Sequence, residues 1–139
     1  MEAIDIPFVK HIGIELQEDD TLSLELTPNV ENHIQTIHAV AQFALAETGS
    51  GLFLQSLFPE HAGSVIPLLR SSTVKYKHPA SKKIRAIAHI DNESKDKFEK
   101  QFLRKGRAQI TIQVEIKDSD DVTTMVGEFG WFVSGSGDF

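Results

Sequence analysis

The chain has no cysteine and fewer basic than acidic residues, and each shortage excludes a class of protein. Without cysteine, its 139 residues hold no disulfide, no thiolate-ligated zinc and no cysteine nucleophile. The 14 basic residues against 20 acidic ones give a net charge of −6, which argues against a general binder of nucleic acid or anionic membranes. The length suits one domain with a substantial core. We therefore expect a single domain over residues 1–139, with a flexible tail at 135–139.

The sequence also lacks an evident targeting or membrane-spanning segment. Residues 1–5 contain no basic region followed by an apolar one, so they do not resemble a signal peptide. Residues 37–58 have about the length of a membrane span, but Gln42, Glu47 and Gln55 interrupt them and no basic cluster flanks them. We expect a core helix here, in a cytoplasmic protein that binds no membrane.

One carboxylate, Glu47, stands alone in the most apolar part of the chain. From residue 32 to residue 59 there is no Lys, no Arg and no other acid. A carboxylate in a buried helix is costly unless it is paired or hydrogen-bonded. Burial raises its pKa and suits it to act as a base or a nucleophile. Glu47 is therefore a candidate functional residue, and the alternative is a buried acid satisfied by backbone, Ser or Thr groups.

The segment around Glu47 predicts a helix over residues 38–58 that is apolar on nearly all sides. Such a helix is enclosed by the rest of the fold rather than laid on its surface. Gly49 and Gly51 interrupt it, although glycine costs helix stability. We expect these two glycines to allow another backbone to pack closely.

The rest of the chain predicts strands of one sheet. Alternating apolar residues and turn signals indicate a helical turn at 5–11 capped by Asp5, a hairpin of 13–17 and 22–27, strands at 64–77 and 82–91, a helix at 92–105 capped by Asn92 or Ser94, and strands at 108–116 and 122–133. No repeat or linker divides them. The simplest way to bury the helix is an α+β fold, with one long antiparallel β-sheet wrapped around a central α-helix.

Three residues before and within this helix have a recurring spacing. Asn32 stands six residues before His38, and Glu47 stands nine after it, while residues 72–80 form an aromatic-containing strand that ends in Pro-Ala. This pattern resembles the hotdog-fold thioesterase superfamily, in its phenylacetyl-CoA-type branch. There the loop reads Asn, then Gly-x-x-His-Gly-Gly, with an acid nine residues after the His. The resemblance covers about residues 10–134.

The resemblance implies thioester hydrolysis. Glu47 would activate water or attack the carbonyl, Asn32 would orient the water or the carbonyl, and the N–H of Ala39 would stabilise the oxyanion. His38 is a further candidate, whose alternative role is to cap or orient the helix. The family site is built across a homodimer, with the acid of one chain facing the loop of the other, so we expect a homodimer or homotetramer. Coenzyme A would enter only as part of the substrate.

The chain departs from the family pattern at the glycines. His-Gly-Gly becomes His38-Ala39-Val40, and the Gly three residues before the His is Gln35. Ala39 keeps the backbone N–H that the chemistry needs at the helix N-terminus. The added methyl groups of Ala39 and Val40 would narrow the acyl or pantetheine tunnel.

Further candidate substrate contacts follow from the same resemblance. Some relatives carry a Thr one turn after the acid; that place is Gly51 here, with Thr48 and Ser50 nearby. Coenzyme A phosphates would need cations. The candidates, all near the expected tunnel mouth, are Lys82, Lys83, Arg85, Lys105 and Arg107. The alternative for each is an ordinary solvated charge.

Two other functions fit the sequence less fully. Hotdog dehydratases pair a loop His with a helix Glu fourteen residues later, as His33 and Glu47 are placed here, but the glycine and proline residues around that pair are absent. A non-catalytic acyl or acyl-CoA binding module would fit the lost glycines. His33 and His38 have no third ligand at metal spacing, so we expect no metal site. The acyl chain, and whether its carrier is coenzyme A or a carrier protein, stay open.

Overall fold

A computed structural model describes residues 2–61 and 63–135. The predicted flexible tail lies outside the described residues, except for Gly135. In order, the chain forms the 3-10 turn η1 (Ala3–Asp5), α1 (Pro7–Ile12), β1 (Glu15–Leu16), β2 (Leu22–Leu24), η2 (Pro28–Val30), α2 (Ala39–Leu57), η3 (Pro59–His61), β3 (Ile66–Tyr76), β4 (Ile84–His89), α3 (Asn92–Lys105), β5 (Arg107–Asp118) and β6 (Thr123–Ser134). The α+β prediction is confirmed.

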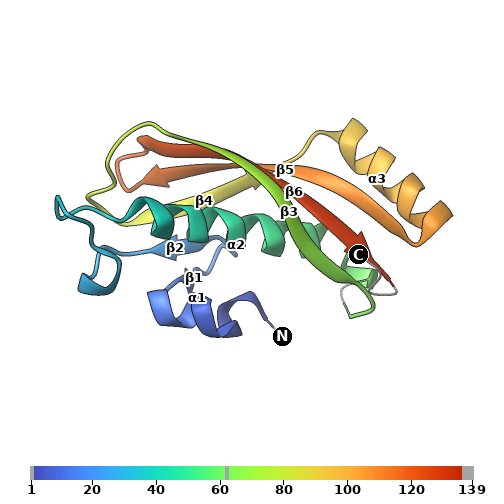
Figure 1. Cartoon of the computed structure of the whole chain (residues 1–139), viewed down its shortest axis with the longest axis horizontal. Helices are drawn as coiled ribbons and strands as arrows, with labels where there is room; N and C mark the ends of the chain where they lie inside the picture. The colour runs from blue at the N-terminus through green and yellow to red at the C-terminus, as the bar shows by residue number, and fades with distance from the viewer. Residues whose placement is uncertain (1, 62, 136–139) are drawn as a thin grey trace.

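The strands form one six-stranded antiparallel sheet that curves around α2 (Figure 1). The strand order is β1-β2-β4-β5-β6-β3, so β3 and β1 are the two edges. Alternate residues of β5, from Ala108 to Ile116, are buried against the helix, while the residues between them lie on the outer face. The sheet therefore has one apolar face, which encloses α2, and one polar face.

Helix α2 is the centre of the core. It matches the predicted helix to within one residue at each end, and its buried residues occur on all sides. It contacts β2, β3, β4, β5 and β6. None of the helices in the described part of the chain combines the length and apolarity needed to cross a bilayer.

Gly49 and Gly51 allow α2 to lie close to the sheet. A Cβ atom at Gly49 would stand 2.8 Å from the Cβ of Ala86 on β4, and one at Gly51 would stand 3.2 Å from the Cζ2 of Trp131 on β6. Close packing at both glycines is confirmed. However, the neighbour is a side chain in both cases, not the backbone that we expected, because the sheet presents its side chains to the helix.

The structure corrects two predicted helix caps. Asp91, not Asn92 or Ser94, caps α3, because its carboxylate accepts the N–H of Ser94 at 2.7 Å. Asp5 lies in η1 and does not cap α1, which starts with Pro7 after Ile6 and has no side-chain cap. Proline at the first helical position has no backbone N–H, so its nitrogen needs no hydrogen-bond acceptor.

Candidate functional site

Glu47 lies in the middle of α2, half-buried. Across residues 2–61 and 63–135, no hydrogen bond or ion pair reaches its carboxylate. Burial raises the pKa of Glu47 above its ordinary value of 4.5, and loss of hydration is the only cause. Neither a backbone group nor a Ser or Thr hydroxyl satisfies this acid. It has the free oxygens and the raised pKa that a general base needs.

The hydroxyl groups near Glu47 hold the helix rather than the carboxylate. Ser50 Oγ donates to the carbonyl oxygen of Glu47 at 2.7 Å and accepts the indole N–H of Trp131 at 2.9 Å. Thr48 Oγ1 donates to the carbonyl oxygen of Ala44 at 2.7 Å. Ser50 thus fixes the turn that carries Glu47 to β6. Sequence reasoning did not select Trp131, although its place in the inward-facing alternation of the last strand was a usable signal.

Asn32 is engaged within its own loop. Its Oδ1 accepts the N–H groups of Ile34 and Thr36, each at 3.0 Å, and its Nδ2 donates to Thr36 Oγ1 at 2.8 Å. Such bonding is typical of Asn in tight turns. The side chain therefore organises the loop before α2, which is a simpler role than the predicted orientation of water.

Gln35 adopts the backbone conformation that suits glycine. Its φ angle is +60°, in the left-handed region, and it stands where the resembling family has a glycine. Side chains other than Gly, Asn and Asp enter this region at a cost. The loop hydrogen bonds around Asn32 hold Gln35 there, so the loop keeps its shape although the glycine is lost. Gln35 is exposed.

The N-terminus of α2 offers one open donor. His38 Nδ1 accepts the N–H of Val40 at 3.0 Å, so His38 caps the helix. The N–H of Ala39 has no acceptor in the described part of the chain. The hydroxyl of Tyr76, at the end of β3, donates to the carbonyl oxygen of Ala39 at 3.0 Å. The Ala39 N–H is free to bind an oxyanion, and Tyr76, which we had not selected, anchors its peptide.

Replacing His38 with alanine is expected to lower the free energy of unfolding by about 1 kcal/mol, because the helix loses its N-terminal cap. His38→Asn should restore most of that loss, since asparagine also accepts from the first turn. Urea denaturation of the three proteins measures both effects. An alanine variant as stable as the parent would show that the cap contributes nothing to stability.

Ala39 and Glu47 cannot act on the same carbonyl within one chain. They lie eight residues apart on one helix, which corresponds to about 12 Å. A carbonyl that accepts the Ala39 N–H is therefore out of reach of the Glu47 carboxylate of the same chain.

The five candidate cations do not surround one opening. Lys82, Lys83 and Arg85 lie where β4 begins, at the end of the sheet where Ile37, just before α2, bonds Ala80. Lys105 is the last residue of α3 and Arg107 the first of β5, which lies ten residues or about 33 Å from that end. Within one chain the five cations therefore do not flank a single opening, because β5 runs the length of the sheet.

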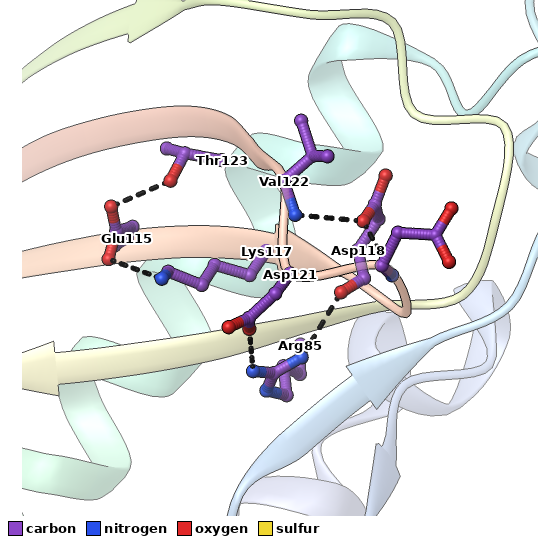
Figure 2. A network of polar contacts seen from close by, with 8 residues as sticks. Arg85, Glu115, Lys117, Asp118, Asp121, Val122 and Thr123 are labelled. Atoms are coloured by element: carbon purple, nitrogen blue, oxygen red, sulfur yellow. Dashed lines mark hydrogen bonds and ion pairs between the residues drawn. The ribbon is translucent and has the colours of Figure 1, made fainter.

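Acidic residues of the turn between β5 and β6 already form ion pairs with two of these cations. Arg85 Nη2 bonds Asp121 at 2.6 Å and Arg85 Nη1 donates to the carbonyl oxygen of Asp118 at 3.1 Å (Figure 2). Lys82 is paired with Asp120, which raises the pKa of Lys82, and Arg85 lowers the pKa of Asp121. Among the described residues, Lys83 contacts only Gln17, to which its Nζ donates at 3.5 Å. It is the member of this group best able to take a phosphate.

The arrangement predicted for a dehydratase is not formed within this chain. His33 is exposed on the loop before α2, and no contact joins it to Glu47 among the described residues. That part of the chain also holds no group of three His, Asp or Glu side chains able to ligate a metal.

The curved antiparallel sheet around one long helix, with an acid at the middle of that helix, defines a hotdog-fold protein. The chain belongs to the family described as "Domain of unknown function (DUF4442)", which matches residues 3–133. The predicted hotdog fold is confirmed, while the phenylacetyl-CoA-type branch is not the family that matches. No curated protein matches the chain.

Solved structures support the fold. PA5026 of Pseudomonas aeruginosa, described as a protein of unknown function and probable thioesterase, is 22% identical, with a TM-score of 0.80 over 95% of this chain and 90% of that one. A mutant of the thioesterase enzyme SAV0944 of Staphylococcus aureus is 19% identical, with a TM-score of 0.72 over 93% and 99%. BH2602 of Bacillus halodurans, solved with CoA, is 19% identical, with a TM-score of 0.68 over 88% and 72%.

Proposed function

We propose that this protein is an acyl-CoA thioesterase in which Glu47 is the general base or nucleophile. The observation that carries the proposal is the state of Glu47, a half-buried carboxylate with a raised pKa and no partner among the described residues. Buried, unpaired acids are rare unless they have a function. Among the proteins of similar fold, SAV0944 is described as a thioesterase enzyme and BH2602 was solved with CoA.

In the proposed reaction, the oxygen of water adds to the thioester carbonyl carbon while Glu47 accepts its proton. The negative charge that develops on the carbonyl oxygen is stabilised by the open N–H of Ala39, at the positive end of the α2 dipole. Collapse of the intermediate breaks the C–S bond. The thiolate leaves and takes up the proton, so the products are a carboxylic acid and free coenzyme A.

We further propose that the site is completed by a second copy of the chain. A twofold interface brings each residue of one copy against the matching surface of the other. If Ala39 of one copy lies beside Glu47 of the other, the same twofold places Glu47 of the first copy beside Ala39 of the second, so the dimer would hold two sites. Val40 is 61% exposed on α2, and β3 has one edge that no described residue pairs. An exposed apolar residue and an open strand edge favour association.

Coenzyme A would bind with its phosphates toward the end of the sheet where α2 begins. Of the three predicted cations there, Lys82, Lys83 and Arg85, Lys83 is the one without a carboxylate partner in the described chain. Lys82 and Arg85 could take part only by exchanging Asp120 and Asp121 for phosphate. The predicted substrate contacts of Gln35, Val40 and Gly51 are part of the same proposal.

The test is release of free thiol from a panel of acyl-CoAs, measured with a thiol reagent. The protein has no cysteine, so it contributes no background signal. We expect turnover of at least one substrate, and sedimentation should give a dimer or tetramer at micromolar concentration. Turnover by a clean monomer would contradict the shared site.

A non-catalytic acyl-CoA binding protein is the second candidate. The bonds that hold Asn32 within its own loop favour it, because they leave the site without the predicted water-orienting group. Tight binding of acyl-CoA with no turnover of any member of the panel would support this function over hydrolysis.

A further inference from the structure

A cavity of about 160 Å³ lies where α2 ends, beside α3, the start of β3 and the end of β6 (Figure 1). It is separate from the candidate catalytic residue, because its lining includes neither Glu47 nor Gly51. The indole of Trp131 packs against Gly51 and donates to Ser50, so it covers the face of α2 between Glu47 and the cavity. The cavity can therefore hold a molecule of its own, independently of any reaction at Glu47.

The floor of the cavity is apolar and largely aromatic. Its most buried side chains, each at most 8% exposed, are those of Leu54, Phe58, Phe98 and Val133. The ring centroids of Phe58 and Phe98 lie 4.7 Å apart, and Phe102 stacks on Phe98 at 6.2 Å. Apolar cavities of about 150 Å³ stay dry and bind benzene-sized molecules. The apolar part of a ligand here should therefore be one ring or an alkyl group of about six carbons.

The rim of the cavity carries negative charge. Glu60 and Glu99 are among the lining residues, and no Lys or Arg is among the described residues that line it. Glu60 has a partner, since His61 Nε2 lies 3.8 Å from its Oε1. Glu99 is half-buried and makes no hydrogen bond or ion pair in the described part of the chain. An unpaired carboxylate that is partly removed from water attracts a cation and repels an anion.

The aromatic side chains favour the same kind of ligand. The face of a phenyl ring carries partial negative charge and attracts an ammonium group that lies over it. Phe58, Phe98 and Phe102 offer such rings, and His61 extends the group by packing against Phe102 with centroids 5.1 Å apart. Leu103 lines the cavity yet is 81% exposed, so a ligand would remove part of this side chain from water. The lining therefore distinguishes an organic cation from a neutral or anionic molecule of equal size.

We propose that this cavity is a second ligand site, which binds a small organic cation with an apolar body and an ammonium group. The apolar body lies on the floor against Phe58 and Phe98, and the ammonium group lies at the rim beside Glu99. Helix α3 supplies both Phe98 and Glu99, so this helix determines which ligand binds. The inference goes beyond the proposed function and does not depend on it, because the two sites share no residue.

The experiment compares three molecules that share one ring and differ in charge, namely benzylamine, benzyl alcohol and benzoate. Each is titrated into the unmodified protein at about pH 8, where histidine is ordinarily neutral and a primary amine is still protonated. Amide chemical shifts measured by NMR give the affinity and locate the ligand. Benzylamine should bind about tenfold more tightly than benzyl alcohol, and benzoate more weakly still. The largest shifts should lie at the end of α2, in α3 and at the end of β6.

Two substitutions test the charge and the volume of the site separately. Glu99→Gln keeps the shape of the side chain, and it should lower the affinity for benzylamine about fivefold without changing that for benzyl alcohol. Its control is Glu93→Gln, at an exposed acid of the same helix outside the lining, which should change neither affinity. Val65→Phe places a larger side chain in the lining and should weaken binding of both ligands at least about tenfold. Its control is Ile6→Phe, at an exposed aliphatic residue outside the lining.

Each part of the inference can be contradicted. Absence of benzylamine binding at millimolar concentration, or shifts confined to another part of the protein, would overturn the site. Equal affinities for the three ligands would overturn its preference for a cation. Unaltered binding by Val65→Phe would show that the ligand lies elsewhere. If that variant fails to fold, which its NMR spectrum would show, Glu99→Gln decides, and an affinity for benzylamine equal to that of Glu93→Gln would overturn the inference.

Discussion

Replacing Glu47 with glutamine is expected to lower the rate of thioester hydrolysis by at least about a hundredfold. Glutamine keeps the shape of the side chain but can neither accept a proton nor attack as a carboxylate. The loss should appear in kcat, because Glu47 would accept the proton or attack the carbonyl in the transition state. Thiol release from the best acyl-CoA substrate, with both proteins at equal concentration, measures it.

The matched control for this prediction is Glu128→Gln. Glu128 is an exposed acid on the outer face of β6, in a surface groove whose lining includes neither Glu47 nor Ala39. The same loss of charge there should leave hydrolysis unchanged. Activity of Glu47→Gln close to that of the parent protein would rule out Glu47 as base or nucleophile.

Because the pKa of Glu47 is raised, the activity and stability of the parent protein and of Glu47→Gln should depend differently on pH. Hydrolysis needs the ionised carboxylate, so the acid limb of kcat/KM should lie above 4.5, the ordinary value for Glu. For stability, the folded state holds this proton more tightly than the unfolded state. The stability linked to Glu47 is therefore greatest below 4.5 and falls as the pH rises through the raised pKa.

Glu47→Gln should remove this dependence and be more stable than the parent protein at neutral pH. Thermal unfolding at an acidic and at a neutral pH measures the difference. Parallel curves for the two proteins would mean that Glu47 is not desolvated in solution.

Replacing Gly49 with valine is expected to lower the free energy of unfolding by about 3 kcal/mol. The added Cβ atom would stand 2.8 Å from the Cβ of Ala86, and two further methyl groups must fit between α2 and β4. A dense core has no room for them, so the helix or the strand must move. Urea denaturation measures the loss.

Gly63→Val is the control for this substitution. A Cβ atom at Gly63 would have no neighbour within 4 Å, so the same change there should cost less than about 1 kcal/mol. Combining Gly49→Ala with Ala86→Gly moves one methyl group from strand to helix and should recover stability that Gly49→Ala alone loses. Equal losses at Gly49 and Gly63 would contradict the close approach of α2 to β4.

The wrapped helix and the long strands could be predicted because they depend on local patterns. Residues 38–58 are apolar on all sides, and such a helix needs a sheet around it. The alternation from Ala108 to Ile116 determines which face of β5 is buried. The caps of α1 and α3 were wrong because Asp5, Asn92 and Ser94 are all residue types that favour helix starts. Composition alone does not choose among neighbouring residues of these types.

Part of the candidate site could likewise be predicted from the sequence, and part could not. The isolation of Glu47 is visible in the sequence, because it is a property of neighbouring residues. The bond from Trp131 to Ser50 and the pairing of Arg85 with Asp121 join residues 81 and 36 positions apart. No periodicity connects such residues, so neither the anchor of the Glu47 turn nor the loss of free cations could be predicted.

By itself, the sequence determined one buried helix with a lone carboxylate and the strands to enclose it, since hydrophobic periodicity acts over a few residues. Only the tertiary structure decided what surrounds that carboxylate. It gave Glu47 no partner among the described residues, bonded Asn32 within its own loop, and formed an apolar cavity from residues as distant as Leu54 and Val133. The physical reason is that burial, pairing and cavity shape arise where distant segments meet, and the packing of the whole chain determines where they meet.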